Sequence, residues 1–187
     1  MAHVKGLVLL SRFEYLEKTH GPSVFRDFLK KIGTDETDFL RQPVDGANLY
    51  SESLLAKVDQ VLLDDYFDQN QEEFQKLGEW NARNLIDRFF NLYMEEQNPV
   101  GFLEQYARLR GLLIGSGIMT MIEKAQYNIL VTIDYGQNIP KSVCLSEQGF
   151  ISGALELCGA KKIKIGESVC AASQESMCCK FDIHYVI

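Results

Sequence analysis

Residues 161–187, KKIKIGESVCAASQESMCCKFDIHYVI, contain two segments in which apolar and polar residues alternate. The alternation runs through 161–170, stops in the polar stretch AASQES, and returns in 177–187. A period of two residues places successive side chains on opposite faces of a β-strand. These residues therefore predict a pair of closing strands joined by a short polar connection.

The residues before these strands predict a helix over 143–158, preceded by two strands over 118–127 and 128–135. In the helix, Gly149 and Gly153 have a small-xxx-small spacing that would let a neighbouring element approach closely. The first half of the chain has helical periodicity instead, over 22–32, 50–67, 69–96 (with a break at Gly78) and 100–113.

The N-terminal residues 4–10 form an apolar run rich in β-forming residues, and Ser11 with Glu14 has the spacing of a helix capping box. The predicted order is thus one strand, several helices and then ββαββ. This order predicts a mixed α/β (α+β) fold with a helical N-terminal half and an antiparallel sheet. A length of 187 residues without repeats or linkers predicts a single domain over 1–187.

The charge balance excludes several partners. The net charge is −7, which argues against nucleic acid and against an anionic membrane surface, because both need basic patches. No apolar run approaches the roughly 18 residues of a membrane-spanning helix. The stretch GLVLL before Ser11 is too short for a signal peptide. We therefore expect a cytoplasmic protein.

All five cysteines lie in the last quarter of the chain. Disulfides are improbable in a reducing cytosol, so a metal site, a redox switch and ordinary buried thiols remain as interpretations. In the last predicted strand, Cys179 belongs to the apolar series with Phe181 and Ile183, whereas Cys178 faces the other side. Adjacent cysteines that point to opposite faces pair poorly, which disfavours a Cys178–Cys179 switch.

Glu167 stands in the apolar series of its own strand, where a carboxylate is costly unless it is paired or coordinated. Cys170 closes the same strand, and Cys144 lies on one helical face with Ile151 and Leu155. Three thiolates and one carboxylate are a plausible tetrahedral zinc set. The alternative is that these are buried free cysteines and that Glu167 lies at a strand end in water.

The C-terminal arrangement is a helix with Cys and Gly-x-x-x-Gly, then E-x-x-C, then C-x-F. It resembles the 4-vinyl-reductase-type (V4R) ligand-binding domain of aromatic-responsive transcription activators, whose fold is similar to that of TRAPP small subunits and haem-nitric-oxide-binding domains. Three longer stretches are similar to an uncharacterised paralogous bacterial family described in myxobacteria: VKGLVLLSRFEYLEKTHG, KLGEWNAR and ISGALELCGAKKIKIGESVCAASQESMCCKF.

In aromatic-sensing members of the V4R family, three cysteines and a glutamate hold a structural zinc. The resemblance carries this set onto Cys144, Glu167 and Cys170. The last ligand is ambiguous, because counting eight residues from Cys170 gives Cys178, whereas the C-x-F register gives Cys179. The inward face favours Cys179, with Cys178 as the alternative.

A set of aromatic residues at helical spacings is interpreted mainly as core, and in this type of fold such residues could also line an apolar ligand cavity. They are Phe89, Phe90, Tyr93, Phe102 and Tyr106. Haem is not expected, because the related nitric-oxide sensors use a proximal histidine. The three histidines, His3, His20 and His184, lie outside the helices of residues 50–113.

These observations predict a non-enzymatic sensory or adaptor domain that binds a small hydrophobic or aromatic ligand and holds a structural zinc. Signalling would pass through a homodimer or another protein partner. The alternative is a protein–protein interaction or scaffold subunit without ligand or metal. An enzyme is not expected, since no nucleophile, base and orienting group can be assembled from the sequence.

Overall fold

The computed structural model describes residues 3–33, 42–86, 98–173 and 175–187. The chain forms two compact units. Unit 1 comprises residues 1–70 together with 112–115, and unit 2 comprises residues 71–111 together with 116–187. Within the described ranges, every helix falls short of the length or apolar character that a bilayer-spanning helix needs.

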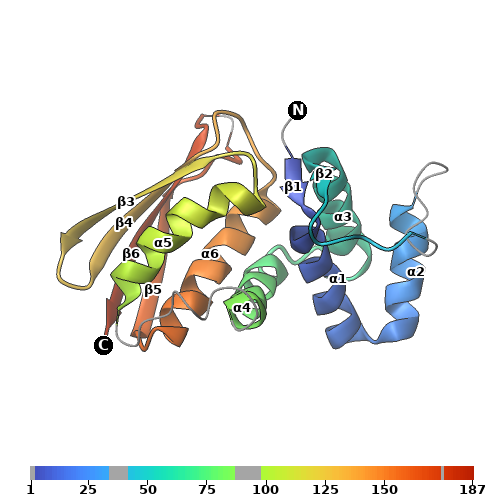
Figure 1. Ribbon diagram of the computed structural model, residues 1–187, viewed down its shortest axis with the longest axis horizontal. Coiled ribbons are helices and arrows are strands. Elements are labelled where there is room, and N and C mark those ends of the chain that lie inside the picture. The colour runs from blue at the N-terminus through green and yellow to red at the C-terminus, as the bar shows by residue number, and fades with distance from the viewer. Residues whose placement is uncertain (1–2, 34–41, 87–97, 174) are drawn as a thin grey trace. The chain divides into compact units, whose positions relative to one another are not determined.

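Unit 1 is mainly helical. Strand β1 (His3–Lys5) pairs antiparallel with β2 (Leu49–Ser51), and the helices are α1 (Gly6–His20), α2 (Pro22–Ile32) and α3 (Glu52–Asp65) (Figure 1). Ser51 caps α3, since its hydroxyl oxygen accepts a hydrogen bond from the Leu54 backbone N–H. The mainly apolar core contains a buried ion pair between Arg12 and Asp59, whose nitrogen and oxygen are 2.9 Å apart.

The strand that we expected over residues 4–10 is wrong beyond Lys5, because Gly6 already begins α1. Ser11 is buried inside this helix, where its hydroxyl donates to the Val8 carbonyl oxygen instead of capping. The reason is the spacing of Leu9, Phe13 and Leu16, which puts all three on one helical face, where they are buried. This stripe outweighs the local β preference of the sequence VLL.

Unit 2 is an antiparallel sheet with helices, as expected from the sequence. Its strands are β3 (Ile118–Ala125), β4 (Asn128–Asp134), β5 (Lys161–Val169) and β6 (Cys178–Val186), in the spatial order β3-β4-β6-β5. The helices are α4 (Glu73–Leu85), α5 (Pro99–Leu113, of which residues 99–111 belong to unit 2) and α6 (Lys141–Leu157). Helices α5 and α6 lie on one face of the sheet (Figure 1).

The two central strands of this sheet set the side chains that face the helices. In β4, Ile129, Val131 and Ile133 are fully buried. Their antiparallel partners in β6 are Ile183, Phe181 and Cys179, which are also fully buried. The strand register therefore turns Cys179 toward the interior, and it keeps the sulfur of Cys178 out of the apolar core.

Helices α4 and α6 pack at very short range, because glycines lie where they cross. A Cβ atom on Gly149 would overlap the Gln75 carbonyl oxygen, and one on Gly153 would lie 2.9 Å from Ala82 Cβ. The expected close approach at these two glycines is confirmed. The expected break at Gly78 is wrong: α4 continues through this residue, whose missing side chain makes room for Ser146 and Phe150 of α6.

The glycine contacts lead to a matched prediction. Gly149→Ala should destabilise unit 2 by about 1–3 kcal/mol, because overpacking a tight contact forces the backbones apart. Gly111→Ala lies at an exposed helical position, with no atom of the described residues within 4 Å of the added carbon, and should stabilise unit 2 by about 0.5–1 kcal/mol. Urea unfolding followed by the fluorescence of Trp80, the single tryptophan, measures both. Equal effects of the two substitutions would contradict the packing described above.

Candidate metal centre

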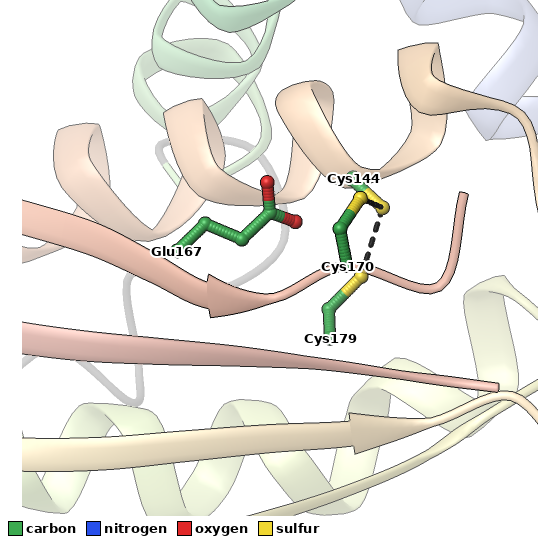
Figure 2. Close-up of side chains that lie close together, drawn as sticks. All are labelled: Cys144, Glu167, Cys170 and Cys179. Carbon is green, nitrogen blue, oxygen red and sulfur yellow. Dashed lines mark hydrogen bonds between the residues drawn. The ribbon is translucent and has the colours of Figure 1, made fainter. Parts of the chain in front are cut away.

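Four side chains from α6, β5, the residue after β5, and β6 meet in unit 2. They are Cys144, Glu167, Cys170 and Cys179, and one ligand atom from each lies within 4.8 Å of all the others. Figure 2 shows the carboxylate of Glu167 turned toward the three sulfur atoms. The structure thus brings together the four groups that the sequence analysis named.

One of two sulfur–sulfur distances in the cluster is close to that of a tetrahedral metal site, and the other is shorter. Metal–sulfur bonds of about 2.3 Å place the sulfur atoms of a tetrahedron about 3.8 Å apart. The Cys144 and Cys170 sulfurs are 3.6 Å apart, whereas those of Cys144 and Cys179 are only 2.8 Å apart and share a hydrogen bond (Figure 2). A metal bound by all three sulfurs would therefore need the Cys144 and Cys179 sulfurs to lie roughly 1 Å farther apart.

The neighbouring cysteines 178 and 179 differ sharply. Cys179 is fully buried, and its sulfur also accepts a hydrogen bond from the Ala171 backbone N–H at 3.4 Å. Cys178 is half-buried, and its sulfur lies 3.4 Å from the Ser176 hydroxyl oxygen. Cys179 therefore belongs to the cluster in this geometry, and Cys178 lies outside it.

A lysine completes the surroundings of the cluster. Lys141, the first residue of α6, donates hydrogen bonds to Glu167 Oε2 and to the Cys170 sulfur, the latter at 3.3 Å. Burial disfavours the charged ammonium, but these two bonds outweigh it and raise the pKa of Lys141. The lysine therefore stays positively charged beside the carboxylate and the thiol.

The two buried thiols of the cluster are electrostatically unequal. The hydrogen bond with Cys179, followed by burial, raises the pKa of Cys144 well above its usual range. The hydrogen bond from Cys144 lowers the pKa of Cys179 despite its burial. Because metals bind thiolates, metal binding here would release protons.

The connection between Cys170 and Cys179 is held by the segment that precedes α6. The side-chain amide of Asn138 donates to the backbone oxygens of Ser173 (2.8 Å) and Ala171 (3.2 Å). The backbone N–H groups of Tyr135 and Ile139 donate to Met177 and Ala171. These bonds position both cysteines before any ion is bound, which reduces the ordering that a ligand would have to impose.

A second buried polar group lies beside the centre. Arg110 of α5 is fully buried and forms an ion pair with Glu147 of α6, with 3.0 Å between nitrogen and oxygen. The Tyr106 hydroxyl donates to the same carboxylate oxygen at 2.8 Å, and Arg110 Nη1 donates to the backbone oxygens of Ser116 and Gly117. Burial, followed by the charge of Glu147, raises the pKa of Tyr106 well above its usual range. This network joins α5, α6 and the start of β3.

Sequence reasoning missed Lys141, Arg110 and Glu147. The one available signal was helical spacing, since Lys141 and Glu147 each stand three residues from Cys144 and therefore near its face of α6. That spacing does not identify partners. The partners lie on β5 and α5, and only the packed structure brings them into contact.

The structure describes two of the five aromatic residues that were predicted to line a ligand cavity. Phe89, Phe90 and Tyr93 lie outside the described residues. Phe102 and Tyr106 are buried, their rings stack with centroids 6.1 Å apart, and Tyr106 stacks on Phe150 at 4.6 Å. These two rings are therefore in contact with other side chains in the interior of unit 2.

A surface groove of about 630 Å³ lies elsewhere on unit 2. Its lining is largely polar and includes Arg83 and Glu156, which form an exposed ion pair, and residues 159–163. Of the aromatic residues named for ligand binding, the two that the structure describes, Phe102 and Tyr106, do not line it. This groove does not have the apolar character that we expected for the ligand site.

No family model matches the sequence, and neither does any curated protein. Solved structures do match in fold. An H-NOX protein from S. oneidensis in the Fe(II)NO ligation state has a TM-score of 0.76 at 16% identity, covering 98% of this chain and 99% of that one. A point mutant of T. tengcongensis H-NOX has a TM-score of 0.73 at 14% identity, with 98% of each chain covered. The expected mixed α/β fold, similar to that of haem-nitric-oxide-binding proteins, is confirmed.

An unliganded Fe(II) H-NOX mutant from K. algicida also matches, with a TM-score of 0.70 at 12% identity over 98% of this chain and 97% of that one. Identities this low establish the fold alone. The resemblance to V4R domains, TRAPP subunits and the myxobacterial family finds no counterpart in these comparisons and stays a prediction.

The expected absence of haem is contradicted by the same structures. They are H-NOX proteins described in iron ligation states, and one structure with this fold concerns haem redox potential and porphyrin distortion. Excluding haem from the histidine positions alone was therefore wrong. His3, His20 and His184 all have exposed side chains, so the described residues do not fit a haem bound through a buried histidine.

Proposed function

We propose that this chain is a non-enzymatic sensory domain that binds a small ligand and carries a structural zinc ion. Zinc would be bound by Cys144, Glu167, Cys170 and Cys179. The observation that carries the proposal is the convergence of these four groups from α6, β5 and β6, with ligand atoms within 4.8 Å of one another. Three sulfurs and one oxygen suit a tetrahedral zinc site without an open position.

The fold supports the sensory part of the proposal. H-NOX proteins share the fold over nearly the whole chain, and their descriptions name iron and nitric oxide as what they bind. The ligand proposed here is a small hydrophobic or aromatic molecule. Its signal would leave through a homodimer or another protein partner. A ligand can bias such a domain only if it binds two conformations unequally.

One observation favours a second function. Phe102 and Tyr106 are stacked and buried against Phe150, so this part of unit 2 is filled by its own side chains. A filled interior suits a scaffold or protein-interaction subunit that needs no ligand. Ligand titration separates the two functions.

Metal analysis of adjacent cysteine variants tests the zinc site. The purified wild-type protein should contain about one zinc per chain, and Cys178→Ser should retain it. Cys179→Ser should lose most of it, because a hydroxyl is a poor replacement for a thiolate ligand. The two substitutions are chemically identical and lie one residue apart, so overall damage to β6 affects both. Metal-free wild-type protein with normal folding would contradict the site.

Binding of the small ligand is tested with phenol and toluene as probes and Trp80 fluorescence as the signal, since Trp80 lies in α4 of unit 2. Saturable binding of one probe molecule per chain would support the sensory function. Hemin is titrated in parallel because of the fold shared with H-NOX proteins. A Soret band that saturates at one hemin per chain would replace the apolar ligand by haem, and no saturable binding would favour the scaffold function.

A further inference from the structure

The carboxylate of Glu167 is held asymmetrically. Its Oε2 atom accepts a hydrogen bond from the ammonium of Lys141. Its Oε1 atom is buried and has no hydrogen-bond partner among the residues that the structure describes. A buried carboxylate oxygen without a partner costs free energy. The group is thus oriented by one oxygen, and the other is free to bind a cation.

Lys141 occupies an unfavourable place for a lysine. It is the first residue of α6, where the aligned peptide dipoles give a partial positive charge that repels a cation. Its side chain is only about one-third exposed (34%), which further disfavours an ammonium group. The contacts with Glu167 and Cys170 offset both costs. Lys141 therefore has a role toward these two side chains rather than toward the helix.

With a zinc ion bound, the cluster would still carry excess negative charge, which a further cation nearby would stabilise. Three thiolates and one carboxylate carry four negative charges, and Zn²⁺ supplies two positive ones. The surplus of two negative charges lies in a mostly buried site, where uncompensated charge is costly. The ammonium of Lys141 halves the surplus without occupying a ligand position, because it contacts Oε2 and leaves Oε1 free.

We propose that Lys141 is a positioning residue of the metal centre. It holds Glu167 Oε2, so that Glu167 binds the metal through Oε1 alone, and it hydrogen-bonds the thiolate of Cys170. This inference rests on the proposed zinc site and assigns the ligand atom and the outer residue that orients it. Outer groups of this kind typically change metal affinity 10- to 100-fold.

The test compares Lys141→Met, Lys141→Arg and Lys161→Met as full-length proteins. Lys161 is an exposed lysine at the start of β5, so Lys161→Met removes the same charge elsewhere in unit 2. Zinc affinity is measured by competition with a chromophoric chelator. Lys141→Met should bind zinc about 10- to 100-fold more weakly, Lys141→Arg should recover part of the loss, and Lys161→Met should match the wild type.

A second measurement reports on Glu167 directly. In Co²⁺-loaded protein, the d–d bands depend on the fourth ligand, so Lys141→Met should shift them toward the spectrum of Glu167→Ala. In the Glu167→Ala background, Lys141→Met should lower the affinity by less than it does in the wild type, because only the contact with Cys170 remains to be lost. Circular dichroism and Trp80 fluorescence check that each variant is folded, and the loss of an unfavourable charge from the start of α6 should not unfold it.

The outcomes separate the two proposals. If the folded wild-type protein binds neither zinc nor cobalt, both the proposed metal site and the proposed role of Lys141 are wrong. If the wild type binds one ion and Lys141→Met binds it equally or more tightly with an unchanged cobalt spectrum, the site stands and the role of Lys141 is overturned. Tighter binding would mean that the ammonium competes with the metal.

Discussion

Chelation of zinc should lower the free energy of unfolding of unit 2 by about 4 kcal/mol, relative to protein at a free zinc concentration a thousandfold above its dissociation constant. The physical reason is that the ligand set joins α6 to β5 and β6, and this geometry exists only in the folded state. Urea unfolding followed by Trp80 fluorescence, in zinc-buffered and in chelator-treated samples, measures the difference.

Cys144→Ala supplies the control for this prediction. It removes one buried ligand from α6 and should abolish the response of the unfolding midpoint to zinc. Its stability should match that of the chelated wild type to within about 1–2 kcal/mol, since only a small buried group is deleted. Identical unfolding curves of the wild type with and without zinc would show that the four groups hold no structural metal.

Arg110→Met should destabilise unit 2 by about 3–5 kcal/mol, because it leaves the Glu147 carboxylate buried without its cation. Both side chains of this pair are almost fully inaccessible, with exposed fractions of 1% and 3%. The triple substitution Arg110→Met, Glu147→Leu and Tyr106→Phe should recover more than half of the loss, since it removes the stranded polar groups as well. Thermal or urea unfolding of the three proteins measures these values.

Arg83→Met is the matched control for Arg110→Met. Arg83 also lies in unit 2 and pairs with Glu156 at 2.8 Å, but its side chain is 53% exposed. Water solvates both partners, so the loss should stay within about 0.5 kcal/mol. Comparable losses in the two arginine variants would mean that the Arg110 pair is no more important to unit 2 than a surface ion pair.

Local patterns in the sequence were sufficient to predict much of the fold. The alternation in residues 178–186 correctly separated the buried Cys179 from Cys178. The helix with Gly149 and Gly153 was expected to receive a close neighbour, and α4 is that neighbour. The prediction failed where two patterns overlapped, at residues 6–10, because a helical stripe extending to Leu16 outweighed a short β-forming run.

The candidate site, like the fold, was predicted in part correctly and in part wrongly from the sequence. The faces of Cys144, Glu167 and Cys179, together with the resemblance to V4R domains, named these three residues and Cys170 without any contact being known, and the structure places their ligand atoms together. Metal binding by them stays a prediction. The absence of haem was inferred from residue types alone, and the fold contradicts it, because a cofactor is held by the shape of a whole domain as well as by one ligand.

The sequence by itself therefore determined the order of the main helices and strands of unit 2 and the opposite directions of Cys178 and Cys179, because both follow from periodicities within a few residues. Only the tertiary structure decided which groups meet. Lys141 contacts a carboxylate 26 residues away, and Arg110 one 37 residues away. Such pairs depend on how helices pack on a sheet, and no local repeat encodes that packing.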